Sequence, residues 1–251
     1  MQHLTILTGA SRGMGRAIAE QLCRADALVL CISRGRPDAL NALARERGAT
    51  LMQWSADLAD PAPAAARLRV WLGERDGKQI ASATLINNAG VIGGTGPLDA
   101  AGAVAIATAL RVDLEAPMQL TAAFIAATSG WNIPRKVLNI SSGSGRRPMA
   151  GAALYCAAKA GMDHFSRCVA LEQAGRANAV RIVSLAPGII DTDMQTELRA
   201  GDPLAFPERD NFVRMKDSGA LTTPADAARR VLTYLARPNF GDQPVADVRD
   251  A

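Results

Sequence analysis

The chain has 251 residues, of which 49% are hydrophobic, and its 28 basic and 24 acidic residues give a net charge of +4. This composition is typical of a folded globular protein and gives no sign of disorder. The basic residues are spread over much of the chain and aromatic residues make up only 4%, so a nucleic-acid partner is not expected.

The apolar runs are too short to cross a membrane, and the N-terminal residues lack the basic segment and cleavage site of a signal peptide. We therefore expect a cytoplasmic protein with no membrane partner. The four cysteines form no C-x-x-C pair and are expected to be free thiols, buried or half-buried. Because the only histidines are His3 and His164, no metal site is predicted, and no G-x-S-x-G motif supports a serine hydrolase.

Strands and helices alternate along the first half of the chain. Strands are predicted at residues 4–8, 27–33, 50–54 and 82–86, and helices at residues 13–25, 37–47 and 61–74. Each strand is a nearly continuous apolar run followed by a helix. This order is typical of a parallel sheet that is covered by helices on both faces.

The second half continues the alternation until residue 190. Helices are predicted at residues 102–128 and 155–173, and strands at residues 136–140 and 180–185. Residues 191–218 are polar and contain two prolines, so we expect an insertion with short helices that borders a pocket. A helix at 224–236 and a strand at 245–248 end the chain. The predicted fold is α/β: one doubly wound domain spanning residues 1–251, with a mostly parallel seven-stranded sheet.

A glycine-rich turn follows the first strand, with its glycines spaced as G-x-x-x-G-x-G. Glycine lets the backbone approach a pyrophosphate closely, and the helix that follows offers free N–H groups and a positive dipole end. A tight turn that binds nothing is the alternative. We predict cofactor contacts from this turn at Gly9, Ser11, Arg12, Gly13, Met14 and Gly15.

The end of the second strand indicates which nicotinamide cofactor is used. In a doubly wound fold this point lies beside the adenosine ribose, where an acidic residue binds a free 2′-hydroxyl and an arginine accommodates a 2′-phosphate. The chain has Ser33-Arg34 there and no acidic residue before Asp38, and Arg12 adds a second cation. We predict NADP(H) rather than NAD(H); an arginine that only faces solvent is the alternative.

Three residues suggest a site for carbonyl chemistry. Tyr155 and Lys159 are four residues apart and therefore share one helix face. Ser142 lies thirteen residues before Tyr155, after the predicted strand at 136–140. Ligands of open α/β sheets bind beyond the carboxyl ends of the strands, so this is where chemistry is expected.

Together these motifs resemble the short-chain dehydrogenase/reductase family over essentially the whole chain. The matching pieces are the glycine turn, Asp57-Leu58, Asn87 to Gly90, Ser142, Tyr155 with Lys159, and Pro187 to Thr192. The resemblance implies a Rossmann fold and an NADP(H)-dependent oxidoreductase. It assigns further cofactor contacts to Asp57, Leu58, Asn88, Ala89, Gly90, Tyr155, Lys159, Pro187, Gly188, Ile190 and Thr192.

The residue types suit the reduction of a ketone. Tyr155 can donate the proton that the carbonyl oxygen needs once the Lys159 cation favours the tyrosinate that remains. Ser142 can hydrogen-bond the carbonyl oxygen. The family usually has an asparagine in the central helix as a fourth member of this proton relay. Asp113 stands there instead, so we expect a shifted pH optimum.

Within the family, residues 114–118, 170–173, 187–195 and 212–219 resemble the sepiapterin reductase and benzil reductase branch. This implies an NADPH-dependent carbonyl reductase of a 1,2-diketone such as benzil or of a pterin side-chain ketone such as sepiapterin. Sepiapterin reductases anchor the pterin with a C-terminal aspartate, and Asp247 falls near that place, although a solvated aspartate is the alternative.

The substrate pocket is expected to involve Ser142, Tyr155, Met194 and Asp247, with apolar surface also from Leu198, Leu204 and Phe206. Two other functions stay open: reduction of 3-oxoacyl thioesters or another short-chain alcohol dehydrogenase activity, and an NADP(H)-sensing regulator without turnover. The intact Ser142, Tyr155 and Lys159 argue against a regulator. By the family resemblance, helices 102–128 and 155–173 are expected to form a homodimer or homotetramer interface.

Overall fold

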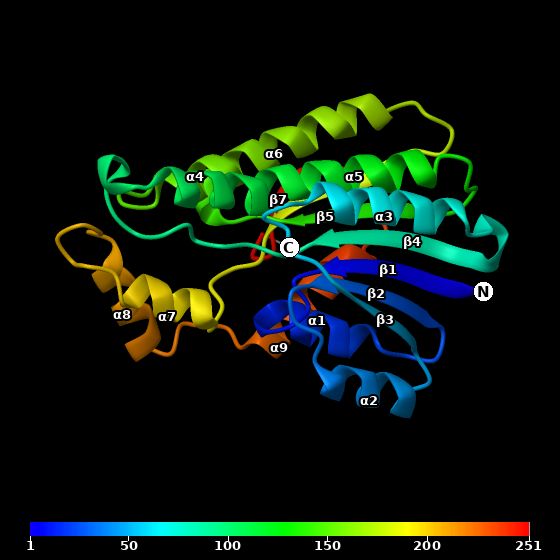
Figure 1. The fold of residues 1–251 in the computed structure, drawn as a ribbon, viewed down its shortest axis with the longest axis horizontal. Coiled ribbons are helices and arrows are strands. Elements are labelled where there is room, and N and C mark those ends of the chain that lie inside the picture. The colour runs from blue at the N-terminus through cyan, green and yellow to red at the C-terminus, as the bar shows by residue number, and fades with distance from the viewer. Residues whose placement is uncertain (251) are drawn as a thin grey trace.

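The computed structural model describes residues 1–250, and seven strands form one sheet in the order β3-β2-β1-β4-β5-β6-β7 (Figure 1). All six neighbouring pairs are parallel, which confirms the predicted α/β fold class. The strands are β1 (Gln2–Thr8), β2 (Ala27–Ser33), β3 (Thr50–Ser55), β4 (Ile80–Asn87), β5 (Arg135–Ile140), β6 (Val180–Ala186) and β7 (Val245–Asp247).

Helices cover both faces of this sheet. They are α1 (Gly13–Leu22), α2 (Asp38–Glu46), α3 (Ala62–Gly73), α4 (Ala103–Leu110), α5 (Ala116–Ala127), α6 (Ala153–Gln173), α7 (Asp193–Arg199), α8 (Arg209–Asp217) and α9 (Pro224–Ala236). Short 3₁₀ turns are η1 (Gly77–Gln79), η2 (Leu98–Ala100) and η4 (Gly143–Gly145). In Figure 1, α3, α5 and α6 lie above the sheet and α1, α2 and α9 lie below it.

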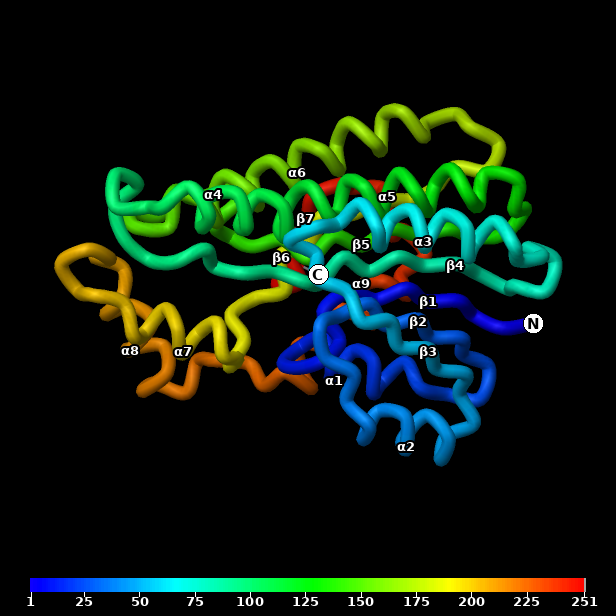
Figure 2. Tube along the Cα trace, viewed as in Figure 1, coloured from blue at the N-terminus to red at the C-terminus, as the bar shows by residue number. Residues whose placement is uncertain are grey.

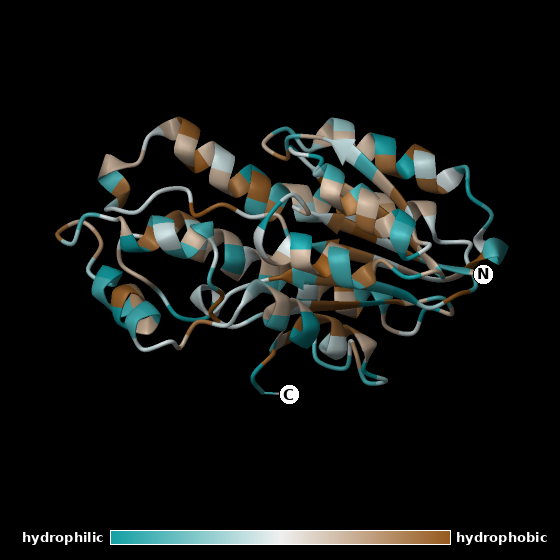
Figure 3. Cartoon of the chain, turned by 90° about the horizontal axis from the view of Figure 1, so that it is seen from below, coloured by the Kyte–Doolittle hydropathy of each residue, from teal (hydrophilic) through white to brown (hydrophobic). Residues whose placement is uncertain are grey.

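Strands such as β2 are apolar on both faces because successive side chains enter two different cores. In β2, Leu28 and Leu30 pack in the core beneath α3 and α5, whereas Val29 and Cys31 pack in the core beneath α1 and α9. This is the period-two alternation of a strand whose two faces are both covered. Figure 3 shows the hydrophobic strands in the middle of the molecule and polar positions on the outer helices.

The helix expected at 102–128 is interrupted. The structure has α4, then a π-helical turn η3 (Arg111–Glu115), then α5, and the chain trace passes through all three without a break (Figure 2). The Ala116 N–H donates to the Arg111 carbonyl, five residues earlier. Pro117 has no N–H and therefore cannot donate to the carbonyl of residue 113 in a regular α-helix. Single π turns of this kind occur frequently at functional sites.

Residues 191–218 form the expected insertion, which carries α7 and α8. Two expectations within it are wrong. Phe206 is fully buried in a small core with Leu198 and Ile92, and the Leu204 side chain is 93% exposed, so neither borders the cleft described below. All four cysteines are free, but Cys168 is exposed on the outer face of α6 rather than buried.

Within residues 1–250, no helix is both long and apolar enough to cross a membrane. In that same part of the chain, no group of three or more His, Cys, Asp or Glu side chains gathers where a metal ion could be held.

Candidate active site

A cleft of about 1340 Å³ lies at the carboxyl ends of the strands, where α7 and α8 extend beyond the sheet. It brings together residues that are far apart in the sequence. Of the predicted site residues it is lined by Gly9, Ser11, Arg12, Gly13, Met14, Gly15, Arg34, Asp57, Leu58, Asn88, Ala89, Gly90, Ser142, Tyr155, Lys159, Pro187, Gly188, Ile190, Thr192 and Met194. Besides Leu204 and Phe206, the predicted residues Asp113 and Asp247 do not line it.

The glycine turn has the shape of a phosphate cradle. Gly9 and Gly13 have φ angles of +71° and +55°, which L side chains rarely adopt. A Cβ at Gly15 would collide with the Gly9 carbonyl oxygen. The α1 helix begins at Gly13 with no acidic residue in its first turn and no side-chain cap from Arg12. Its first N–H groups are therefore available to an anion, and the turn fits the pyrophosphate of a dinucleotide.

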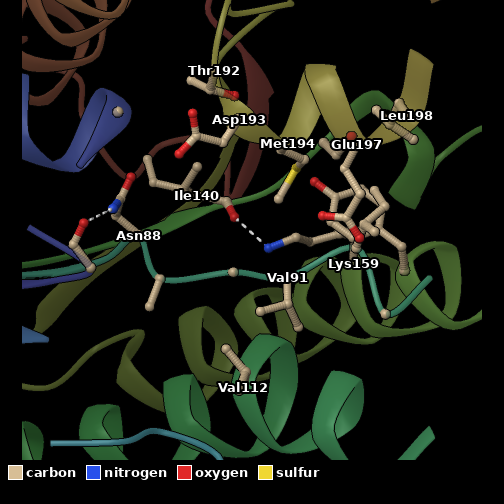
Figure 4. A pocket seen from close by; sticks show the side chains of 18 of the residues that line it. Asn88, Val91, Val112, Ile140, Lys159, Thr192, Asp193, Met194, Glu197 and Leu198 are labelled. Carbon is tan, nitrogen blue, oxygen red and sulfur yellow. Dashed lines mark hydrogen bonds between the residues drawn. The ribbon is translucent and has the colours of Figure 1, made fainter. Parts of the chain in front are cut away.

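Thr8 and Asn88 hold this turn against β4. The Thr8 hydroxyl oxygen accepts hydrogen bonds from the backbone N–H groups of Asn88 and Ala89, at 2.9 and 3.0 Å. The Asn88 amide donates to the carbonyl oxygens of Thr8 and Gly9, at 2.9 and 3.3 Å (Figure 4). Asn88 thus shapes the cradle as well as lining it. The role of Thr8 was not predicted, because a threonine at a strand end carries no distinctive sequence signal.

Two arginines line the cleft at the glycine turn and at the end of β2. Arg34 is exposed just after β2, and its carbonyl oxygen accepts a hydrogen bond from Ser55 at 3.1 Å. The Arg12 guanidinium forms a 3.0 Å ion pair with Asp193, at the start of α7. Both partners are more than two-thirds exposed, so the pair is weak and Arg12 can turn to another anion.

Ser142, Tyr155 and Lys159 face the deeper part of the cleft. Ser142 follows β5, and Tyr155 and Lys159 come from the first two turns of α6. The Lys159 ammonium is buried, donates to the Ile140 carbonyl oxygen at 3.1 Å and lies 5.4 Å from the centre of the Tyr155 ring. Figure 4 shows this ammonium directed at Ile140, with Met194 and Leu198 on the α7 side of the cleft.

The surroundings of Tyr155 keep its hydroxyl protonated. Burial raises the pKa of Tyr155, the charge of Lys159 opposes that rise, and the charge of Asp113 adds to it. A hydrogen bond with Ser142 also lowers the pKa of Tyr155, but the net direction is upward. Near neutral pH the Tyr155 hydroxyl therefore has a proton to donate.

Asp113 lies behind Lys159 in the π turn. It is fully buried, its Oδ1 accepts the Val91 N–H at 2.8 Å, and its Oδ2 lies 3.7 Å from the Lys159 ammonium. Burial raises the pKa of the Asp113 carboxyl, while Lys159 and the Val91 N–H lower it. Gly161 allows α6 to approach this turn closely, because a Cβ there would lie 3.0 Å from Leu114. Asp113 does not line the cleft, and its charge acts on both Lys159 and Tyr155 from behind it.

Comparison with known proteins agrees with this site. Residues 3–203 match the family model described as short chain dehydrogenase. The chain belongs to the short-chain dehydrogenase/reductase family. It is an oxidoreductase of carbonyl or alcohol groups, in a family that uses nicotinamide cofactors.

Individual members of the short-chain dehydrogenase/reductase family are similar to this chain over nearly its whole length. A benzil reductase ((S)-benzoin forming) of Bacillus cereus is 34% identical over 94% of both chains. A sepiapterin reductase of Meriones unguiculatus is 32% identical over 94% of this chain and 92% of its own. The crystal structure of a short-chain dehydrogenase/reductase from Burkholderia vietnamiensis is 34% identical, with a TM-score of 0.65 over 99% of this chain and 98% of its own.

A buried aspartate supports the loop that carries Ser142. Asp163, one turn after Lys159 on α6, accepts hydrogen bonds from the hydroxyls of Ser141 and Ser184, both at 2.6 Å. Its other oxygen is paired with Arg146 at 3.2 Å, directly after η4. These contacts fix the backbone on both sides of Ser142. Sequence reasoning missed Asp163 because its partners come from three separate segments.

The predicted pterin anchor is not a free acid in the cleft. Both oxygens of Asp247 are hydrogen-bonded to the guanidinium of Arg249, at 2.8 and 2.6 Å, and the Asp247 side chain is 7% exposed. Arg249 lines the cleft in its place. The expectation that Asp247 faces the substrate is therefore corrected: a cation stands at this position.

Proposed function

We propose that this chain is an NADPH-dependent carbonyl reductase of activated ketones, with Tyr155 as the proton donor. The observation that carries the proposal is the presence of Ser142, Tyr155 and Lys159 in the same cleft as the glycine turn and Arg34. The benzil and sepiapterin reductases among its relatives support an activated ketone as the substrate.

The residues divide the reaction among them. Ser142 orients the carbonyl oxygen, and Tyr155 gives that oxygen its proton as the carbonyl carbon accepts a hydride. NADPH bound in the cradle supplies the hydride. The tyrosinate that remains is stabilised by the Lys159 ammonium and regains its proton from solvent. The products are the alcohol and the oxidised cofactor, so the step balances in atoms and electrons.

Arg34 supports NADPH as the cofactor. It is an exposed guanidinium at the end of β2, beside Ser33, and no carboxylate precedes Asp38 in this segment. A guanidinium binds a 2′-phosphate with two charge-assisted hydrogen bonds, whereas NADH would leave it without a partner.

The test follows nicotinamide absorbance with NADPH and then NADH, offering benzil and sepiapterin to the wild type and to Tyr155→Phe. We expect oxidation of NADPH by at least one of the two carbonyl compounds, and loss of at least about a hundredfold in kcat for Tyr155→Phe. Binding of NADPH measured by quenching of protein fluorescence shows that the variant is folded. Absence of turnover by a wild type that binds NADPH contradicts the proposal.

A further inference from the structure

The C-terminal end of the chain is held beside the catalytic loop. Arg146, which directly follows η4, donates to the Ala246 carbonyl oxygen in β7 at 2.8 Å. The Val248 N–H donates to the Ala186 carbonyl oxygen at 2.9 Å, and Val248 comes close to Gly188. The residues after β7 therefore lie between the loop that carries Ser142 and the segment that follows β6. Both of these segments line the cleft.

In this segment the side chains of Asp247 and Arg249 form a bidentate ion pair. The Arg249 Nε donates to Oδ1 at 2.8 Å and an Nη donates to Oδ2 at 2.6 Å, while the Arg249 backbone N–H donates to Oδ1 at 2.9 Å. Hydrogen bonds from Arg249 hold the pKa of the Asp247 carboxyl below its usual value, so the carboxylate stays ionised and keeps its partner. Arg146 adds a second positive charge near the same carboxylate.

Asp247 and Arg249 differ in how accessible their side chains are to a ligand in the cleft. The Asp247 side chain is 7% exposed and does not line the cleft, whereas the Arg249 side chain is 59% exposed and does. The Arg249 Nη1 makes no hydrogen bond to any of residues 1–250. The ion pair with Asp247 thus holds the Arg249 guanidinium in place and leaves N–H donors for a ligand. Because the side chain is already held, it loses little conformational freedom when the ligand binds.

We propose that Arg249 is a specificity-determining residue, which selects ketones whose neighbouring carbon carries a second carbonyl or carboxylate oxygen. A 1,2-diketone and a 2-oxo acid both have such an oxygen. A pterin instead offers paired N–H donors, which need a free carboxylate, and Asp247 is occupied by Arg249. This inference rests on the proposed carbonyl reductase function and narrows its substrate to dicarbonyl compounds.

The experiment measures kcat/KM with NADPH for benzil, phenylglyoxylate and sepiapterin, in the wild type, Arg249→Gln and Arg249→Leu. We expect both variants to lose about tenfold or more with benzil and phenylglyoxylate, the usual effect of losing a charge-assisted hydrogen bond. The ratio of sepiapterin to benzil turnover should rise in both, because benzil alone loses its hydrogen bond from Arg249. A larger loss with phenylglyoxylate than with benzil shows that a carboxylate is the preferred partner of Arg249. A larger loss with benzil shows that a second carbonyl is.

Two further variants complete the test. Arg69→Gln changes an exposed arginine on α3 outside the cleft and should leave the ratio unchanged. Asp247→Asn should weaken benzil reduction, since it loosens Arg249, without raising sepiapterin turnover. Thermal unfolding checks that each variant folds. If Arg249→Leu does not fold, the kinetics of Arg249→Gln decide the outcome.

The possible failures are distinguishable. An unchanged ratio of sepiapterin to benzil in a folded Arg249→Gln variant overturns the role of Arg249 and leaves the reductase function standing. A wild type that oxidises NADPH with none of the three compounds contradicts the reductase function itself. A wild type that prefers sepiapterin to benzil also overturns the present inference.

Discussion

Asp113 is the charged group that distinguishes this catalytic site from the usual pattern of its family. Its negative charge disfavours the tyrosinate and so raises the pKa of Tyr155. In Asp113→Asn that contribution disappears, and Tyr155 should ionise at lower pH. We expect the fall of kcat at alkaline pH, where the proton donor is lost, to move to lower pH in a profile of carbonyl reduction.

The matched control for this prediction is Glu115→Gln, which removes an exposed acid from the same π turn and should leave the profile unchanged. If the profiles of Asp113→Asn and the wild type coincide, Asp113 does not influence the proton donor. The comparison needs no assumption about the substrate, because both variants are measured with the same carbonyl compound.

The proposed use of NADPH assigns the choice of cofactor to Arg34. Arg34→Glu removes the cation and introduces a carboxylate that repels a 2′-phosphate but can accept a hydrogen bond from a ribose hydroxyl. We expect the KM for NADPH to rise about 10- to 100-fold and that for NADH to change much less. Steady-state kinetics with both cofactors provide the measurement. Equal KM values for NADPH and NADH in the wild type would refute the prediction.

At the scale of elements, the turn between β1 and α1 depends on the absence of a side chain at Gly15. Gly15→Ala places a methyl group against the Gly9 carbonyl and the Asn88 amide, so the turn must open. We expect a loss of about 1–3 kcal/mol in the free energy of unfolding and a weaker affinity for NADPH. Denaturant unfolding and fluorescence titration measure the two effects.

Gly73→Ala is the control for this change. Gly73 ends α3 and has nothing within 4 Å of a Cβ, so the substitution should leave stability unchanged or raise it by up to about 1 kcal/mol. Equal stability of the two alanine variants would mean that the glycine turn tolerates a side chain.

The sequence predicts the elements well where burial follows a simple period. The apolar runs of β1 and β2 and the helical face of α6 are local patterns, so they can be located without knowing what packs against them. The π turn was missed because its residues mix apolar and charged side chains as a regular helix also does, and Pro117 is its only local signal. Tertiary partners were also beyond prediction: Asp163 accepts hydrogen bonds from Ser141, just after β5, and from Ser184 in β6.

At the scale of the whole molecule, α5 and α6 leave apolar side chains uncovered. Met118 is 41% exposed and Leu171 is 78% exposed, and the chain's own elements do not cover them. We propose that these helices form a homodimer or homotetramer interface, and light scattering should return at least a dimer. Leu171→Lys should shift the mass toward the monomer. Val70→Lys, at a 61% exposed site on α3, should not.

The family and the residues of the cleft could be predicted because these residues stand in recognisable motifs, such as Tyr155 with Lys159. The substrate side was anticipated less well. Asp247 was expected to meet the ligand, yet a residue only two positions later neutralises it. An ion pair between such near neighbours depends on the backbone conformation after β7, which sequence spacing does not determine.

The extra residue in the η3 turn also fixes the rotation of α4 relative to α5. Each residue of an α-helix turns the chain by about 100°, so deleting one residue here would restore a regular helix but swing every α4 side chain by that angle. Val104 and Thr108, which now border the cleft, would then face elsewhere. The loss of a single residue from this turn would thus change one wall of the cleft without altering Ser142 or Tyr155.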